Sequence, residues 1–376
     1  MTKCNFCLMD ETVGNLKLDK NYECKYCRAH KEMEKDYQFN KTPLEKLFEI
    51  AEKIKKENIS KNYDCICGVS GGRDSSYSLY VTKKILGLRP LAVHFDNGFN
   101  SEISVSNIHS ICSSLNIDLE TKVADWETFK NVTRSFFFAG VPDVDITTDI
   151  GIFKTMYEIA YREKINYVFN GHSFRTEGLD PLEWTYMDGL YIKSIFKKFG
   201  KGNLKKFDNF TILDLLKYKF LRNIKTILPL NYVEYDNKKV IEILQKEFDW
   251  QFYGSHHHES TFTKFCVSYY LPKKFNIDRR KTDLSAMIRS KKISLDRAKQ
   301  EIKNPIIIDN QENLINFVLN KLEITRNEFD EILKKKNKNF KNFLTYYNFI
   351  KYFKIIIFIL IKLKLIPKIL YLKYYS

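Results

Sequence analysis

The sequence lacks a run of about 18 apolar residues, which is the length that a membrane-spanning helix requires. The first residues also lack the apolar segment that a secretory signal contains. We therefore expect a cytosolic protein whose cysteine thiols are reduced. With 376 residues, the chain exceeds one ordinary domain and is long enough to bury a substantial core.

Acidic side chains are absent from residues 334–376, which contain eleven of the lysines. The formal net charge of +16 is therefore concentrated in this tail, and about +5 remains for the other 333 residues, so we do not expect a nucleic-acid partner. Seven consecutive apolar residues, 355–361, lie between Lys354 and Lys362. A lysine-rich amphipathic helix of this kind fits the anionic inner face of a membrane, but it equally fits packing against its own protein or a partner.

The Walker sequence Gly-Lys-Ser/Thr is also missing, but a different glycine-rich turn follows a short apolar strand at residues 63–68. A helical pattern follows this turn and ends at Gly87. Two glycines allow the backbone to approach a phosphate, and a helix N-terminus offers N–H groups and partial positive charge. The pattern predicts an anion site, with an ordinary turn as the alternative. The expected contacts are Ser70, Gly71, Gly72, Arg73, Asp74, Ser75 and Ser76.

Half of the eight cysteines lie in the first forty residues, as two Cys-x2-Cys pairs separated by sixteen residues. Two such pairs can present four thiolates to one zinc ion at about 2.3 Å each. Because this segment is too short to build a core, metal binding would supply its folding energy. Four unrelated thiols or two local disulfides are the alternative. We predict a structural zinc ribbon over residues 1–40, with the ligands Cys4, Cys7, Cys24 and Cys27.

Strand-length apolar runs alternate with helical patterns over residues 41–230. This alternation predicts an α/β domain with a doubly wound parallel sheet. Thr42 begins the first helix with a capping box. Two more strands end in polar turns that contain Asp96 and the pair Gly171 and His172. Because the carboxyl ends of parallel strands share one edge, we expect these residues beside the glycine-rich turn, although a plain type I′ turn also explains the first.

Basic, aromatic and histidine residues gather in the predicted helical region 231–333, which precedes the basic tail 334–376. Basic groups suit a diphosphate, and aromatic faces suit a base or a sugar ring. His257 and Glu259 are candidates for acid–base work or for Mg²⁺ binding. A solvated basic helix pair is the alternative. The candidate substrate-binding residues are Lys273, Lys274, Arg279 and Arg280.

The turn Ser-Gly-Gly-Arg-Asp-Ser at 70–75 resembles the signature of the PP-loop ATP pyrophosphatases, which have a HUP-like fold. The runs His-His-Glu-Ser at 257–260 and Tyr-Tyr-Leu-Pro-Lys-Lys-Phe at 269–275 resemble the WbpG-like N-acetyl sugar amidotransferases of bacterial surface-polysaccharide biosynthesis. The resemblance covers roughly residues 1–305. It implies that ATP adenylates the N-acetyl oxygen of a nucleotide-linked sugar, and that ammonia then displaces AMP to leave an acetamidino sugar for the O-antigen of LPS or a related glycan.

The resemblance also implies site roles. Arg73 and Asp74 would act in catalysis with the candidates of the helical region, Asp74 would lie near Mg²⁺, and the cofactors would be ATP, Mg²⁺ and Zn²⁺. None of the eight cysteines lies in a nucleophile turn with a histidine partner. The ammonia would therefore come from a separate glutaminase with an ammonia-channelling partner.

Two other functions remain open from the sequence. The first is a PP-loop tRNA-thiolating enzyme, which usually needs additional cysteines near the site. Beyond the ribbon, this chain has only Cys65, Cys67, Cys112 and Cys266, and no further Cys-x2-Cys pair. The second is a non-catalytic scaffold for polysaccharide assembly, which the complete turn signature argues against.

Overall fold

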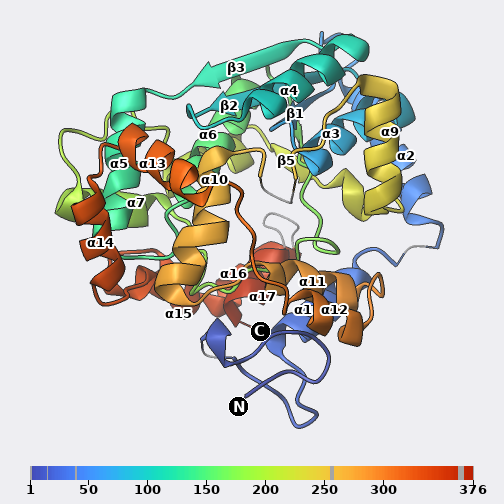
Figure 1. Ribbon diagram of the computed structural model, residues 1–376. Coiled ribbons are helices and arrows are strands. Elements are labelled where there is room, and N and C mark those ends of the chain that lie inside the picture. Colours follow the sequence, from blue (N-terminus) through green and yellow to red (C-terminus); the bar gives the residue numbers. More distant parts are fainter. Residues whose placement is uncertain (1, 15, 39, 255–257, 363–367, 376) are drawn as a thin grey trace.

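The computed structural model describes residues 2–14, 16–38, 40–254, 258–362 and 368–375. Its centre is a sheet of five parallel strands in the order β3-β2-β1-β4-β5 (Figure 1). The strand order reverses between β1 and β4, and the crevice at the carboxyl ends of such strands is where ligands of these sheets bind. The strands are β1 (Cys65–Gly68), β2 (Pro90–Asp96), β3 (Leu119–Val123), β4 (Tyr167–Phe169) and β5 (Lys225–Ile227).

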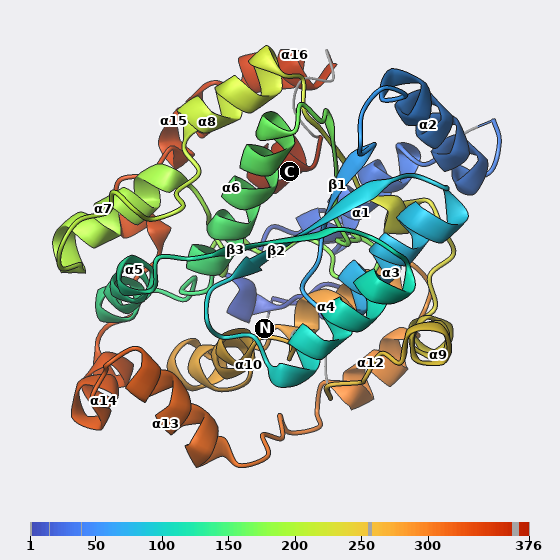
Figure 2. The ribbon, with the colours of Figure 1, turned by 90° about the horizontal axis from the view of Figure 1, so that it is seen from above.

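Helices cover both faces of the sheet, so the predicted doubly wound α/β architecture is confirmed (Figure 2). Alternate residues of β1 point to opposite faces. Cys65 and Cys67 join one apolar cluster with α2, α3, α4 and α9, whereas Ile66 joins another with α6. These helices are α2 (Pro43–Glu57), α3 (Arg73–Tyr80), α4 (Glu102–Ser114), α6 (Ile146–Arg162) and α9 (Asn237–Phe248).

Local sequence signals determine several helix ends. The capping box at Thr42 is confirmed, and the hydroxyl of Ser101 caps α4 by accepting a hydrogen bond from the N–H of Ser104. Residues 311–333, which the periodicity suggests as one helix, form two. The chain turns at Glu323, which has a left-handed φ of 53°, and a new capping box begins at Thr325.

An aromatic helical layer lies beside the sheet. Phe137 of this layer packs against Phe262, Tyr270 and Phe329 from the later part of the chain. The layer therefore joins the α/β half to the C-terminal helical region. Its helices are α5 (Trp126–Ala139), α7 (Gly189–Phe199), α10 (Thr261–Phe265), η5 (Cys266–Phe275), α13 (Gln311–Lys321) and α14 (Arg326–Lys334). Other elements are η1 (Glu11–Val13), η2 (Val81–Ile85), α8 (Ile212–Leu216), η3 (Lys217–Leu221), η4 (Pro229–Asn231), α11 (Arg280–Arg289), α12 (Leu295–Glu301), η6 (Phe340–Asn342) and α15 (Tyr347–Tyr352).

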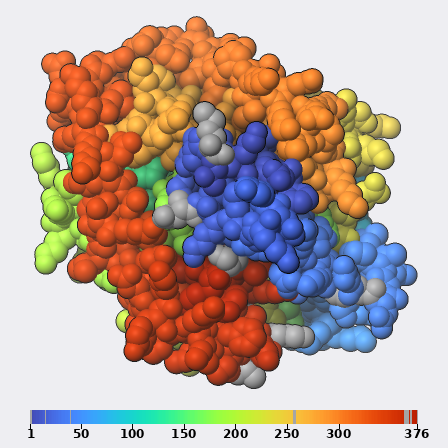
Figure 3. All heavy atoms as spheres, turned by 90° about the horizontal axis from the view of Figure 1, so that it is seen from below, coloured from blue at the N-terminus to red at the C-terminus, as the bar shows by residue number. Residues whose placement is uncertain are grey.

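The two ends of the described chain lie together on one face of the molecule (Figure 3). The N-terminal segment with α1 (Lys25–Lys35) contacts α17 (Lys368–Tyr375), whose Lys368 ammonium donates to the carbonyl of Glu32 at 2.6 Å. This part of the tail therefore packs on its own protein. The neighbouring helix α16 (Lys354–Lys362) instead exposes large apolar side chains to solvent. They are Ile355, Ile356, Phe358 and Ile359.

None of the helices in the described part of the chain combines the length and the apolar character that crossing a membrane requires.

Candidate active site

A cavity of about 520 Å³ lies at the carboxyl ends of β1 and β4. Its walls come from the glycine-rich turn, the tips of β2 and β4, the N-terminus of α6 and the C-terminal helical region. The turn and the tip of β4 thus meet residues from far along the chain at the topological switch point. The predicted site residues that line it are Ser70, Gly72, Arg73, Asp74, Ser75, Gly171, His172, Glu259 and Arg279.

The glycine-rich turn is held by its neighbours. Gly71 has a φ of 73°, and a Cβ built there would lie 2.1 Å from the carbonyl oxygen of Ser104. The Gly71 carbonyl accepts hydrogen bonds from the Trp250 indole at 3.1 Å and from the Asn107 amide at 3.2 Å. Gly71 therefore determines the shape of the turn through its backbone, although it does not itself line the cavity. Ser76 is likewise outside the lining, because it is buried within α3.

Two serine hydroxyls face the cavity at the start of α3. The N–H of Ser70 donates to Oγ of Ser75 at 3.1 Å, and the N–H of Gly72 donates to Oγ of Ser70 at 3.3 Å. These bonds set the turn. The Ser75 hydroxyl also donates to the carbonyl of Gly72 at 3.1 Å, so its proton would rotate from that carbonyl to reach a ligand. Together with the N-terminus of α3, the two hydroxyls provide donors suited to a phosphate.

Arg73 and Asp74 form an ion pair beneath this turn. Nε of Arg73 lies 2.7 Å from Oδ1 of Asp74 and 2.8 Å from the Tyr235 hydroxyl, which itself donates to Asp74. Burial opposes the charge of Arg73, but the carboxylate of Asp74 raises the pKa of the guanidinium and keeps it cationic. A Mg²⁺ ion at Asp74 would therefore compete with two internal partners.

The tip of β4 touches the N-terminus of α3. A Cβ on Gly171 would lie 2.8 Å from the backbone of Asp74 and Ser75, so only glycine allows this approach. Nδ1 of His172 lies 2.7 Å from a carboxylate oxygen of Glu177. Burial disfavours the imidazolium, yet the Glu177 carboxylate outweighs it and raises the pKa of His172. This tip thus supplies a histidine suited to carrying a proton beside the turn.

The tip of β2 contributes amides in place of the expected carboxylate. Oδ1 of Asp96 accepts from the N–H of Gly98 at 2.7 Å and from the Asn100 amide at 2.9 Å, so Asp96 closes its own turn and lies outside the cavity lining. Asn97 and Asn100 line the cavity. His94, which is buried, also lines it and bonds the Val69 carbonyl through Nδ1 at 3.0 Å.

Glu259 brings a carboxylate from the C-terminal region to the glycine-rich turn. Its Oε1 would lie 2.8 Å from a Cβ on Gly72, and its carbonyl accepts from the N–H of Ser101 at 3.0 Å. His256 and His257 lie outside the described residues.

Of the four predicted basic contacts, only Arg279 lines the cavity, where it pairs with Asp180 at 2.9 Å. Lys274 is buried elsewhere, and its ammonium donates to the carbonyls of Ile332 and Lys335 at 2.7 Å each. Lys273 is exposed, and Arg280 pairs with Asp278 at 2.7 Å. These three residues do not line the cavity.

The cavity also has an acidic end that was not predicted from the sequence. We define it as the part lined by Asp145, Asp149, Asp180, Arg279 and Lys373. Burial and then the nearby charge of Asp145 raise the pKa of Asp149 to about 7. Burial also lowers the pKa of the Lys373 ammonium. The i,i+4 spacing of the first two carboxylates, which places them on one helix face, was the available signal. Nothing local in the sequence indicates that Lys373 reaches this cavity.

The four N-terminal cysteines form a second site, with their sulfurs within 4.8 Å of one another. Cys4 and Cys27 are 3.8 Å apart, and Cys24 is 3.6 Å from both Cys7 and Cys27. A tetrahedron of sulfurs about 2.3 Å from a zinc ion has edges of about 3.8 Å, so both donor type and spacing fit Zn²⁺. The cysteines are free thiols in the structure, which argues against local disulfides.

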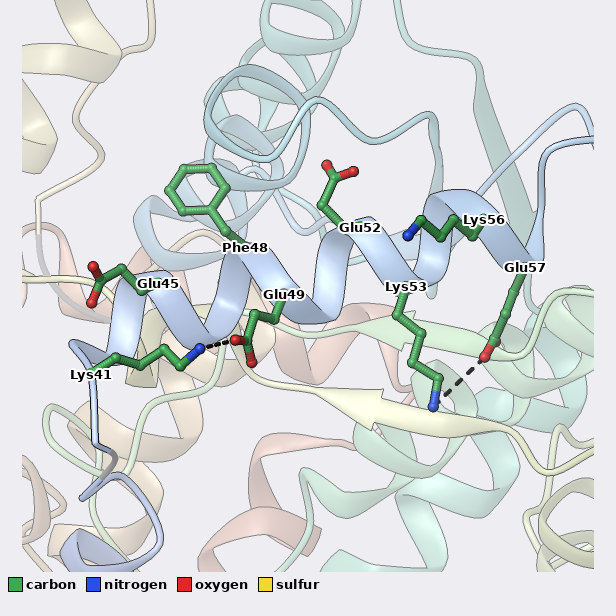
Figure 4. A pocket seen from close by; sticks show the side chains of 8 residues that line it. All are labelled: Lys41, Glu45, Phe48, Glu49, Glu52, Lys53, Lys56 and Glu57. Atoms are coloured by element: carbon green, nitrogen blue, oxygen red, sulfur yellow. Dashed lines mark ion pairs between the residues drawn. The ribbon is translucent and has the colours of Figure 1, made fainter.

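A shallow hollow also runs along the exposed face of α2 (Figure 4). Lys41 pairs with Glu49, and Lys53 lies 3.8 Å from Glu57. Exposed pairs of this kind contribute about 0–1 kcal/mol and are screened by salt. Because these charges satisfy one another in solvent, we assign the chemistry to the cavity at the sheet.

The fold and the cavity define the class of protein: a doubly wound α/β protein with a cavity at its switch point and an N-terminal cluster of four cysteines. More particularly, residues 259–356 match the family described as "LPS biosynthesis protein WbpG-like, C-terminal domain". This region is similar to the WbpG-like C-terminal domain, and it contributes Glu259 and Arg279 to the cavity. The match continues past the limit of roughly 305 that the resemblance suggested.

A solved structure titled as a predicted subunit of tRNA methyltransferase, from Methanocaldococcus jannaschii, is similar over 58% of this chain and 90% of that chain. The sequence identity is 15% and the TM-score is 0.30, which does not establish a shared function. The comparison with curated proteins gives no match.

Proposed function

We propose that this protein is an ATP-dependent amidotransferase that converts the N-acetyl group of a nucleotide-linked sugar into an acetamidino group for LPS O-antigen or a related surface glycan. One observation carries the proposal. The glycine-rich turn at the N-terminus of α3 opens into the same cavity as Glu259 and Arg279 of the WbpG-like domain. A donor-rich turn suits the phosphates of ATP, and the WbpG-like domain supplies the link to LPS biosynthesis.

The reaction has two steps. The amide oxygen of the N-acetyl group forms a bond to the α-phosphorus of ATP, and the bond from that phosphorus to the β-phosphate oxygen breaks to release pyrophosphate. Ammonia then adds to the imidate carbon, the C–O bond breaks, and AMP leaves with the former amide oxygen. Adenylation is needed because an amide oxygen is otherwise a poor leaving group. The turn from Ser70 to Ser75 would bind the departing pyrophosphate, and Arg73 would stabilise its charge.

The position of the Glu259 carboxylate favours a bound cation at the glycine-rich turn. A carboxylate beside Gly72 would repel the phosphates of ATP unless a positive ion lay between them. Mg²⁺ prefers oxygen ligands and is commonly bound by one or two carboxylates together with phosphates, so Glu259 fits it. Asp74 would join as a ligand only by leaving its partners Arg73 and Tyr235. When bound, the ion would neutralise charge on the leaving phosphates.

The acidic end of the cavity offers hydrogen-bonding groups that suit the N-acetyl sugar. Carboxylates accept hydrogen bonds from hydroxyl and acetamido N–H groups, and Arg279 donates to oxygens. Trp184 also lines this cavity and offers an apolar face to a ring. His172 would accept a proton as ammonia attacks, with Glu177 stabilising the imidazolium. The ammonia itself would come from a separate glutaminase and its channelling partner.

The test is a product assay with pure protein, ATP, Mg²⁺, ammonium and a panel of UDP- and CMP-linked N-acetyl sugars. The expected result is AMP together with a sugar whose mass falls by the difference between O and NH. Asp74→Asn should lower the rate of AMP formation by at least about 100-fold, because it removes the carboxylate that pairs with the buried guanidinium of Arg73. Asp296→Asn, at a side chain that is 90% exposed on α12, is the matched control.

The main rival, a tRNA-thiolating enzyme, would need a reactive thiol in the cavity. Cys266 is the cysteine that lines it, and burial raises the pKa of that thiol well above its ordinary value. A protonated, buried thiol is a poor nucleophile. AMP formation that depends on added tRNA would nevertheless replace our proposal with this one, and AMP formation with neither sugar nor tRNA modified would refute both.

A further inference from the structure

The four-cysteine site and the cavity are joined by one helix, α11. Arg289 ends this helix, and its guanidinium donates to the sulfurs of Cys7 at 3.2 Å and Cys27 at 3.3 Å. Arg279 precedes the same helix, and its guanidinium bonds Thr185 and Asp180 in the cavity at 2.9 Å each. Ten residues of helix place these two arginines roughly 15 Å apart.

The ribbon also holds the body of α11. The N–H of Leu8, which follows the first cysteine pair, donates to Oγ of Ser285 at 3.1 Å. The ammonium of Lys281 donates to Asp10 at 2.7 Å and to Thr12 at 3.0 Å. These bonds come from the segment between the two cysteine pairs, so the shape of the ribbon determines where α11 lies.

The segment 172–187, which forms part of the cavity wall, contacts both α11 and the N-terminal ribbon, to which α1 belongs. A Cβ on Gly178 would lie 3.1 Å from the Cβ of Ala286 in α11, which leaves little room between them. Arg175 pairs with Glu34 of α1 at 2.7 Å. Glu177 and Asp180, which line the cavity, flank Gly178 on this segment. A shift of the ribbon or of α11 would therefore move the acidic end.

We propose that Arg289 is a positioning residue that couples the metal site to the acidic end of the cavity. A zinc ion with four thiolates has a formal charge of −2, and the guanidinium of Arg289 offsets part of it while bonding two of the sulfurs. The metal then fixes the ribbon, the ribbon and Arg289 fix α11, and α11 fixes Arg279. The step to substrate rests on the proposed function, but the metal and helix steps do not.

The first test measures zinc release. Zinc-loaded wild type, Arg289→Gln and Arg289→Lys would be mixed with a chromogenic chelator, with Arg297→Gln on exposed α12 as the matched control. We expect zinc affinity to fall roughly 10- to 100-fold in Arg289→Gln, which is typical for loss of an outer partner of a metal ligand. Arg289→Lys keeps the positive charge but loses the planar guanidinium that donates to two sulfurs at once. Its zinc affinity should therefore lie between those of the wild type and Arg289→Gln. Equal affinities in Arg289→Gln and Arg297→Gln would overturn the proposal.

The second test measures amide hydrogen exchange before and after zinc removal from the wild type. Exchange should increase in peptides covering 177–187 and 280–289, and it should stay unchanged in β1 and β4. Unchanged exchange in α11 would break the link between ribbon and cavity. If the product assay succeeds, Arg289→Lys should raise KM for the sugar more than KM for ATP. If that assay fails, zinc release and exchange still decide this proposal alone.

Discussion

Replacing Gly71 by alanine is expected to disable the glycine-rich turn more severely than its small size suggests. The added Cβ would lie 2.1 Å from the carbonyl oxygen of Ser104, where ordinary contact begins at 3.4 Å. The turn or α4 must therefore move by about 1 Å, which typically costs about 1–3 kcal/mol of overpacking. The left-handed φ of 73° adds about 1–2 kcal/mol of backbone strain. Together these predict a loss of about 2–5 kcal/mol in the free energy of unfolding.

Gly202→Ala separates the two causes. Gly202 has a φ of 82°, but a Cβ there meets nothing within 4 Å, so only the backbone strain applies. Urea unfolding of both variants should show Gly71→Ala losing about 1–3 kcal/mol more than Gly202→Ala. Calorimetric binding of pyrophosphate should be lost in Gly71→Ala and kept in Gly202→Ala. Equal stabilities, or normal pyrophosphate binding by Gly71→Ala, would refute this account of the turn.

Three further outcomes follow from the structure. Burial raises the pKa of Asp143 to about 7, so between about pH 4 and pH 7 the folded protein keeps a proton that the unfolded chain loses. Urea unfolding should show this carboxyl lowering the stability by up to about 4 kcal/mol across that range, and Asp143→Asn should remove its share of the slope while the share of Asp149 remains. Glu177→Gln should lower the pKa of His172, as followed by NMR titration, because burial disfavours the imidazolium and the largest opposing charge is removed, which leaves the charges of Asp180 and Asp74. The double substitution Ile356→Ser with Phe358→Ser should weaken co-sedimentation with phosphatidylglycerol vesicles at least about tenfold; a wild type that ignores these vesicles at low salt would contradict the idea of membrane contact.

The sequence was sufficient for four of the five strands, for the glycine-rich turn and for the four-cysteine site, because each depends on spacing within a short segment. Strand-length runs and helix caps such as Thr42 are local signals. The two Cys-x2-Cys pairs bring their sulfurs together as their spacing predicts. Strand β5 was missed, since three residues are too few to show a period.

Side-chain direction was harder to foresee, because it depends on partners distant in sequence. Lys274 is a basic residue like Arg279, but its ammonium bonds carbonyls some sixty residues later in the chain and so lies away from the cavity. Asp96 follows a strand as expected, yet Asn100 and Gly98 engage its carboxylate. Lys373 reaches the acidic end only because α17 packs against α1, a contact that no local pattern encodes.

That contact has a consequence for the order in which the molecule folds. The bond from Lys368 to Glu32 closes a loop of 336 residues, whereas β1 and β2 pair across a short crossover. Contacts of large sequence separation form late, because the entropy of closing the loop must be overcome first. The sheet and its turn can therefore assemble while the wall that carries Lys373 is still open. A refolding chain should gain affinity for ATP before it gains affinity for its second substrate, and stopped-flow refolding in the presence of each ligand would resolve the two phases.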